Sequence, residues 1–244
     1  MSGHSKWSTI KRKKGANDAQ RGKIFTKIGR EIMVCVKEGG ADPGGNSKLR
    51  ELIAKAKANN VPNDNIDRVI KKAAGDADKN NYEVVTYEGY GPNGVAVIVK
   101  TLTDNRNRTA GDVRHFFDKF GGNLGTSGCV SFMFELKGVI VIENDNIDEE
   151  KIMDECMMAG ADDFLYEDDA IEIITSTENF SAVRQALEDK GYTLASAEIE
   201  QVPSTYTALN DEESIIKMSR LLEMLDDDDD VQQVWHNWEN PPQE

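Results

Sequence analysis

The spacing of the hydrophobic residues changes near Tyr82, and this change limits the folds that are open to the chain. Before Tyr82, apolar side chains recur with the helical period of about 3.6 residues. After it, runs rich in Val, Ile, Tyr and Thr are separated by glycine and proline turns, which is typical of β-strands. The sequence therefore predicts an α+β protein, with a helical domain at residues 1–78 and sheet-containing domains after a polar linker.

The helical domain is expected to contain three amphipathic helices. The first covers about residues 18–38, the second about residues 48–59, and the third follows Pro62 and stops at Gly75. Stepping about 100° per residue along the first helix gathers its cations on the face opposite the apolar one. These cations are Lys23, Lys27, Arg30 and Lys37. Three such helices can bury one small core.

The rest of the chain predicts two ferredoxin-like α+β domains, one inserted in the other. Residues 138–202 show the order strand, helix, strand, strand, helix, strand, which is the split βαβ arrangement. Residues 82–136 and 205–240 together form the interrupted domain. Its expected elements are strands at 82–88, 95–103 and 129–136, a helix at 109–120, a glycine-rich turn at 121–125, a helix at 211–225 and a strand at 231–238.

The charge is distributed very unevenly between these parts. The formal net charge is −15, yet residues 1–78 carry +8 and the remainder carries −23. Such asymmetry predicts a basic segment that binds nucleic acid or a membrane surface, attached to an acidic body. No apolar run in the sequence is long enough to cross a bilayer, so nucleic acid is the favoured partner and no membrane is expected.

The basic residues are concentrated at the N-terminal end, where residues 1–37 hold ten Lys or Arg against two acidic residues. Lysine and arginine neutralise phosphates and release counterions, which favours binding to nucleic acid. Trp7 or His4 could stack on an exposed base, although a buried Trp7 that anchors a core is the favoured alternative. The predicted nucleic-acid-binding residues are His4, Lys6, Trp7, Lys11, Arg12, Lys13, Lys14, Arg21, Lys23, Lys27 and Arg30.

A second cluster lies at residues 102–109, between a predicted strand and a predicted helix. Arg106 and Arg108 stand beside the N-terminus of that helix, where backbone N–H groups favour anions, so they form a possible secondary anion site. The favoured alternative is that Asn105 and its neighbours cap the helix while the arginines pair with acidic residues.

Five aspartates follow one another at residues 226–230. The run could mimic a polyanion and cover the basic domain, or bind a cation weakly, but a solvated loop is the favoured interpretation. The three histidines and three scattered cysteines show no metal-type or catalytic spacing, so neither a metal, a cofactor nor an enzyme is expected. Reduced cysteines and the lack of an apolar leader predict a cytoplasmic protein.

Several longer motifs resemble the YebC/PmpR family. They are Gly-His-Ser-Lys-Trp at residues 3–7, Gly-Lys-Ile-Phe-Thr-Lys at 22–27, Tyr-Glu-Gly-Tyr-Gly-Pro at 87–92, and the run at 102–109. The resemblance implies three domains, the first of them helical, and nucleic-acid binding without catalysis. Members are described as DNA-binding transcriptional regulators, as mitochondrial translational activators, and as ribosome-associated factors that relieve stalling at proline-rich stretches.

We therefore predict a nucleic-acid-binding regulator of gene expression that acts on DNA. A ribosome-associated translation factor that binds ribosomal RNA is the close alternative, because the sequence shows no helix-turn-helix or heptad zipper. A small-ligand sensor and a nuclease are the remaining alternatives. The oligomeric state is not predicted.

Overall fold

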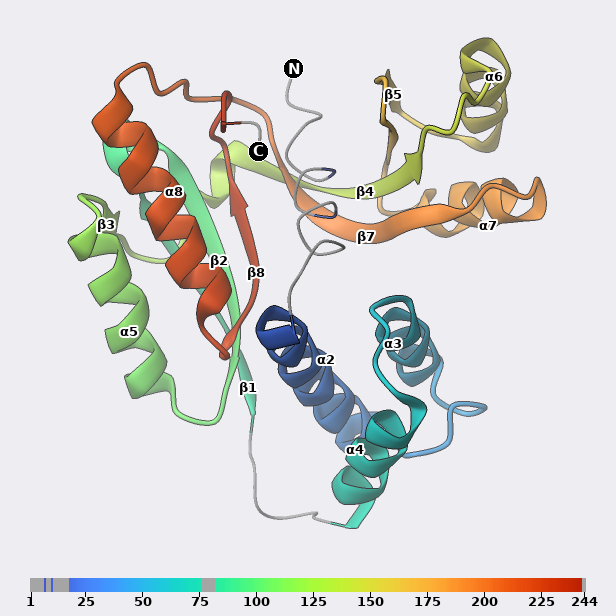
Figure 1. The fold of residues 1–244 in the computed structure, drawn as a ribbon, viewed down its shortest axis with the longest axis horizontal. Coiled ribbons are helices and arrows are strands. Elements are labelled where there is room, and N and C mark those ends of the chain that lie inside the picture. Colours follow the sequence, from blue (N-terminus) through green and yellow to red (C-terminus); the bar gives the residue numbers. More distant parts are fainter. Residues whose placement is uncertain (1–6, 8–9, 11–17, 76–81, 243–244) are drawn as a thin grey trace.

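The protein consists of a helical region followed by two four-stranded antiparallel sheets (Figure 1). This computed structural model describes Trp7, Ile10, residues 18–75 and residues 82–242. In the view of Figure 1 the helical region lies beneath the second sheet and beside the lower part of the first. The α+β class predicted from the sequence is confirmed.

The helical region contains α2 (Asp18–Gly39), α3 (Ser47–Ala58) and α4 (Asn63–Gly75). The amphipathic pattern works as expected, because α2 packs its apolar face on α3 and α4 around Ile32, Leu49 and Ile66. Asn46 joins α2 to α3: its side chain accepts the Leu49 N–H at 3.1 Å and donates to the carbonyl of Cys35 at 3.1 Å. This cap fixes the angle at which α3 leaves α2.

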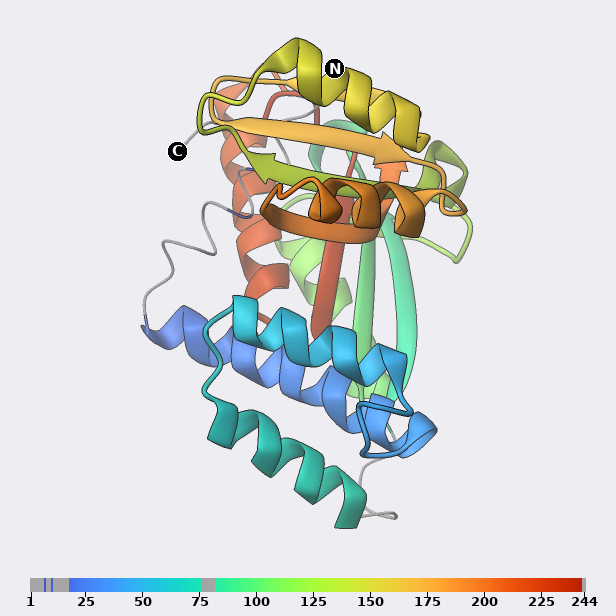
Figure 2. The same cartoon turned by 90° about the vertical axis from the view of Figure 1, so that its right-hand side faces the viewer.

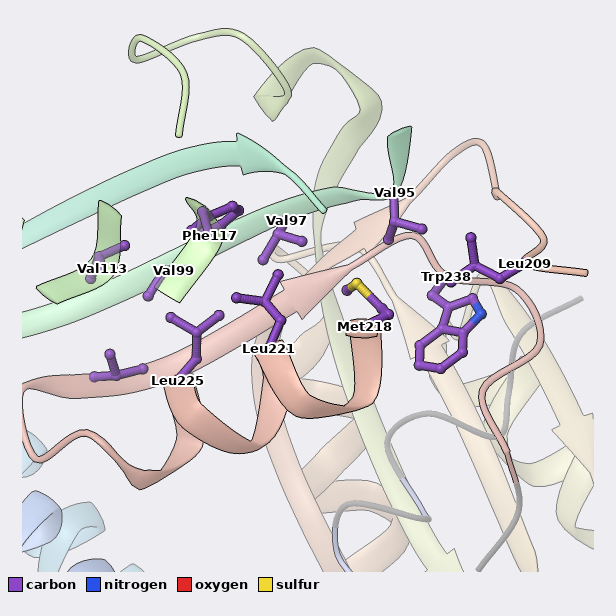
Figure 3. Close-up of a cluster of buried hydrophobic side chains, with 11 residues drawn as sticks. Val95, Val97, Val99, Val113, Phe117, Leu209, Met218, Leu221, Leu225 and Trp238 are labelled. Carbon is purple, nitrogen blue, oxygen red and sulfur yellow. The ribbon is translucent and has the colours of Figure 1, made fainter. Parts of the chain in front are cut away.

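The first sheet has the strand order β3-β1-β2-β8. Helices α5 (Arg106–Lys119) and α8 (Glu212–Asp227) cover one face of it (Figure 1). Valines of β2 meet Val113 and Phe117 of α5 and Leu221 of α8 in the core, as Figure 3 shows. The strands are β1 (Glu83–Tyr90), β2 (Ala96–Thr103), β3 (Asn123–Leu124) and β8 (Val231–His236).

The second sheet is formed by the chain between the two parts of the first sheet, and its order is β5-β6-β4-β7. Helices α6 (Glu149–Ala159) and α7 (Phe180–Asp189) pack on one face. Figure 2 shows this layer above the helical region. Its strands are β4 (Phe134–Glu143), β5 (Asp163–Tyr166), β6 (Ala170–Thr175) and β7 (Leu194–Pro203). This strand order is the ferredoxin-like one.

The two sheets share their content of four strands and two helices but not their strand order. In the first sheet the hairpin partners β1 and β2 are central, and the edge strands β3 and β8 each follow a helix. The domain segments 82–136, 138–202 and 205–240 remain a prediction. Strand β4 runs without a break across residue 137, where the first two of these segments meet.

The predicted strand at residues 129–136 is wrong. Only its end belongs to a strand, and that strand is β4 of the second sheet. The reason is Glu88, whose carboxylate accepts N–H groups from Gly128, Val130 and Ser131 at 2.8 to 2.9 Å. These N–H groups are therefore bonded to a side chain and are not available to pair with a neighbouring strand. The missing strand of the first sheet is β3, which lies within the stretch predicted as a plain turn at 121–125.

No helix in the described part of the chain is both long enough and apolar enough to cross a bilayer.

Candidate nucleic-acid interface

The structure describes only part of the predicted nucleic-acid-binding cluster. His4, Lys6, Lys11, Arg12, Lys13 and Lys14 lie outside the described residues. Arg21 lies in α2, and its side chain is outside the description. The residues whose side chains can be placed are Trp7, Lys23, Lys27 and Arg30, together with Arg106 and Arg108 of the secondary cluster.

Trp7 is buried, with 8% of its surface exposed. It packs against Val139 and Val141 of β4 and Ala170 of β6, on the second sheet. An indole enclosed in this way has no open face on which a base could stack. The structure thus supports the interpretation of Trp7 as a core anchor rather than as a stacking residue.

Lys23, Lys27 and Arg30 lie on one face of α2, as predicted, and this face meets the run Asp226–Asp230, which we call the aspartate strap. The ammonium of Lys23 lies 2.8 Å from Asp227 Oδ1. Lys27 donates to the carbonyl oxygen of Asp226 at 2.7 Å. The interpretation of this run as a solvated loop is therefore wrong, because opposite charge holds it against a helix that is about 200 residues distant in sequence.

Arg30 makes the strongest connection between α2 and the strap. One guanidinium nitrogen, Nη1, donates to the carbonyl oxygen of Asp229 and to Asp230 Oδ1, both at 2.6 Å. The Arg30 side chain is 17% exposed and that of Asp230 is 7% exposed, so this pair is largely shielded from water. Shielding strengthens an ion pair whose hydrogen bonds are complete.

Asp230 also organises the second predicted cluster. Its other oxygen, Oδ2, accepts from Arg108 at 2.6 Å and from the hydroxyl of Thr109 at 2.7 Å. Burial raises the pKa of the Asp230 carboxyl, but hydrogen bonds from Arg108, Thr109 and Arg30 outweigh it and hold the pKa below its ordinary value. Asp230 is therefore a charged link between α2 and the start of α5.

The predicted secondary anion site is thus engaged by the protein's own carboxylates. Arg108 also donates to Asp104 at 2.9 Å, and Asn105 caps α5 by accepting the Arg108 N–H at 3.1 Å. The predicted cap is confirmed. Arg106 is exposed at the surface, and its carbonyl accepts the Tyr87 hydroxyl at 3.4 Å. Arg106 is the arginine of this pair that remains open to an external anion.

Sequence reasoning missed a pair of exposed cations on α3, which faces α4. Arg50 and Lys57 line an open cavity of about 500 Å³ between these helices, next to Ile53 and Asp67. Residues 38–78 contain as many acidic as basic residues, so net charge gave no signal there. The spacing could have found them, since Arg50 and Lys57 are seven residues apart on one helix and share a face.

A second ionic joint connects the helical region to the second sheet. Lys55 of α3 lies 3.3 Å from Glu31 of α2 and 3.3 Å from Glu198 of β7. Burial lowers the pKa of Lys55, but the attraction of Glu198 and Glu31 outweighs it and the pKa lies above its ordinary value. The helical region is thus held by the strap on one side and by Lys55 on the other.

No group of three or more His, Cys, Asp or Glu residues within the described ranges is arranged to hold a metal ion.

Comparisons with known proteins agree on one family. A profile described as the TACO1/YebC protein N-terminal domain matches residues 5–76, and one described as the TACO1/YebC second and third domain matches residues 82–238.

Proteins of similar sequence are named probable transcriptional regulatory protein. One from Ruminiclostridium cellulolyticum is 63% identical over 98% of this chain and 97% of its own length. One from Acetivibrio thermocellus is 62% identical over 98% of this chain and 99% of its own.

A crystal structure of a conserved hypothetical protein from Aquifex aeolicus superposes with a TM-score of 0.83 at 45% identity. The superposition covers 92% of this chain and 93% of that one. Both profiles match in order, the relatives match over nearly their whole length, and the fold is shared. The chain therefore belongs to the TACO1/YebC family.

Proposed function

We propose that this protein is a non-catalytic regulator of gene expression that binds DNA through the basic residues of its helical domain. The observation that carries the proposal is the concentration of positive charge in residues 1–37, which includes the cationic face of α2. A charge density of this kind exceeds what solubility requires. The names of the relatives, probable transcriptional regulatory proteins, support the regulatory part of the proposal.

A ribosome-associated translation factor that binds ribosomal RNA is the second candidate. The observation that favours it is the position of α2, the longest helix of the helical region. Its apolar face packs on α3 and α4, and its basic face is covered by the aspartate strap. A helix enclosed in this way is not presented to a DNA major groove, whereas structured RNA is recognised largely by shape and by phosphate contacts.

The binding test compares the wild type with a variant in which Lys11, Arg12, Lys13 and Lys14 are replaced by Ala. Affinities for a labelled DNA duplex and a labelled RNA stem-loop are measured by fluorescence anisotropy over a range of salt concentrations. We expect weaker binding and a log–log salt slope smaller by roughly 0.7–0.9 for each phosphate contact that is lost. An unchanged slope would show that these four residues contact no phosphate.

The choice between the two targets needs crosslinking in growing cells, followed by sequencing of the attached nucleic acid. Discrete promoter DNA supports the transcriptional regulator. Ribosomal RNA clustered at one site supports the translation factor.

A further inference from the structure

The aspartate strap offers to α2 the kind of oxygen ligands that a nucleic acid would offer. Lys23, Lys27 and Arg30 together contact two carboxylate oxygens and two carbonyl oxygens of the strap. From residue 23 to residue 30 a helix rises roughly 10 Å. One strand of a duplex carries about three phosphates over that length. The strap therefore occupies a row of cations whose number and length suit a phosphate backbone.

The two ends of the strap are held very differently. Asp230 is buried and receives hydrogen bonds from Arg30, Arg108 and Thr109. By contrast, the side chains of the Lys23–Asp227 pair are 38% and 63% exposed. Exposed ion pairs contribute little to stability and are screened by salt, so a polyanion of higher charge density can replace them. The strap is fixed at Asp230, and its releasable contact is that of the Asp227 carboxylate, in the last turn of α8, with Lys23.

Holding the fold together does not require all of this negative charge. The contact from Asp229 to Arg30 uses the backbone carbonyl, which any residue at that position would supply. Asp228 stabilises the turn before β8, since its carboxylate accepts the Asp230 N–H at 2.7 Å. A carboxylate at Asp229 instead adds negative potential beside the cationic face of α2.

We propose that the aspartate strap is an autoinhibitory contact, which covers the basic face of α2 until nucleic acid displaces it. The inference rests on the proposed nucleic-acid-binding function and adds the regulation of that site. Displacement exchanges the Asp227 carboxylate at Lys23 and the Asp226 carbonyl oxygen at Lys27 for phosphate oxygens, while Asp230 keeps the turn anchored. Binding at this face is thereby reserved for ligands with several closely spaced negative charges, and single anions are excluded.

The first test removes strap charge without changing side-chain shape. The full chain carrying Asp227→Asn and Asp229→Asn is compared with the wild type in binding to a labelled RNA stem-loop and a labelled DNA duplex. A matched control, Asp154→Asn with Glu178→Gln, removes the same charge at exposed positions of the second sheet's domain. We expect the strap variant to bind about two- to fivefold more tightly than the control, because one exposed ion pair no longer has to be broken.

A third variant adds Lys23→Ala and Lys27→Ala to the strap substitutions, and it should lose the gain. Equal affinity of the strap variant and the matched control would overturn the inference, and so would a gain that persists without Lys23 and Lys27. In both cases the wild type still binds, so the proposed function stands. Failure of every variant and of the wild type to bind either probe would overturn the proposed function itself.

Hydrogen exchange supplies a measurement that does not depend on mutants. With saturating RNA stem-loop, the amides of residues 226–229 should exchange faster than in the unbound protein, because the end of α8 and the turn after it open more often once their contacts with α2 are lost. Slower exchange there on binding would overturn the inference, since it would place the strap at the nucleic-acid contact rather than away from it.

Discussion

At the scale of single residues, Asp230 connects more of the molecule than any other strap residue described. It joins α2 to the beginning of α5 through Arg30, Arg108 and Thr109. Replacing it by Asn keeps the shape but leaves two arginines without their carboxylate. We expect Asp230→Asn to lower the free energy of unfolding by about 2 kcal/mol, measured by urea denaturation. The control Asp229→Asn should change it by less than about 0.5 kcal/mol, and equal losses would contradict this role of Asp230.

Two buried carboxylates predict how stability depends on pH. Burial raises the pKa of Glu88, but the backbone N–H groups of Gly128, Val130 and Ser131 outweigh it, so its pKa lies below the ordinary value. The pKa of Asp230 is likewise lowered. Depressed pKa values add stability above the unfolded-state pKa, and this stability is lost as the pH falls through the folded-state pKa.

The free energy of unfolding should therefore hold steady down to about pH 5 and fall below it, as followed by denaturation at a series of pH values. The variant Glu88→Gln should be less stable at neutral pH and should lose less on acidification than the wild type. A variant that follows the wild-type acid profile in parallel would show that Glu88 is not one of the groups responsible.

Residue types predicted the cationic face of α2 and named the aspartate run as one candidate cover for the basic domain, but they favoured a solvated loop instead. Lys23, Lys27 and Arg30 share a face because of helical periodicity alone, which is local information. The strap lies about 200 residues away and is brought to α2 only by the completed fold. Trp7 illustrates the same limit, since only the assembled second sheet shows that its indole is enclosed.

At the scale of elements, Gly138 decides how closely α7 can pack on β4. A Cβ atom at this position would collide with Thr175 Oγ1 and with the ring of Phe180. We expect Gly138→Ala to destabilise the protein by about 1–3 kcal/mol through overpacking, measured by thermal or urea unfolding. The control is Gly111→Ala on the exposed side of α5, where a Cβ meets nothing within 4 Å. That change should stabilise the helix by about 0.5–1 kcal/mol.

The helices were predicted to within a few residues, whereas the strands between residues 121 and 143 were not. Helix α2, for example, spans Asp18–Gly39 against a prediction of 18–38. Helical periodicity and caps such as Asn105 act over a few residues, so sequence reveals them. The loop at 125–131 takes its form from Glu88, about 40 residues earlier, and no local pattern could show that the Val130 N–H would bind a side chain.

At the scale of the whole molecule, the described residues show two ionic joints between the helical region and the sheets. Lys55 forms the second of these, with Glu198 of β7. A double-mutant cycle on Lys55→Ala and Glu198→Ala should give a coupling energy of about 0.5–1 kcal/mol, because the pair is partly exposed. The measurement is urea unfolding of the four proteins at low and high salt. A coupling that does not decrease at high salt would contradict an electrostatic joint.

The discontinuous first sheet has a consequence for the order in which the protein folds during its synthesis. Strand β8 pairs with the central strand β2, yet it is made only after the whole second sheet. Chains emerge from the N-terminal end first, at roughly 5–20 residues per second, so the growing polypeptide exposes an edge of β2 for roughly ten seconds. The aspartate strap immediately precedes β8, so one late event closes the sheet and covers α2 together. A growing chain that has not yet reached residue 226 therefore carries the cationic face of α2 without its aspartate cover.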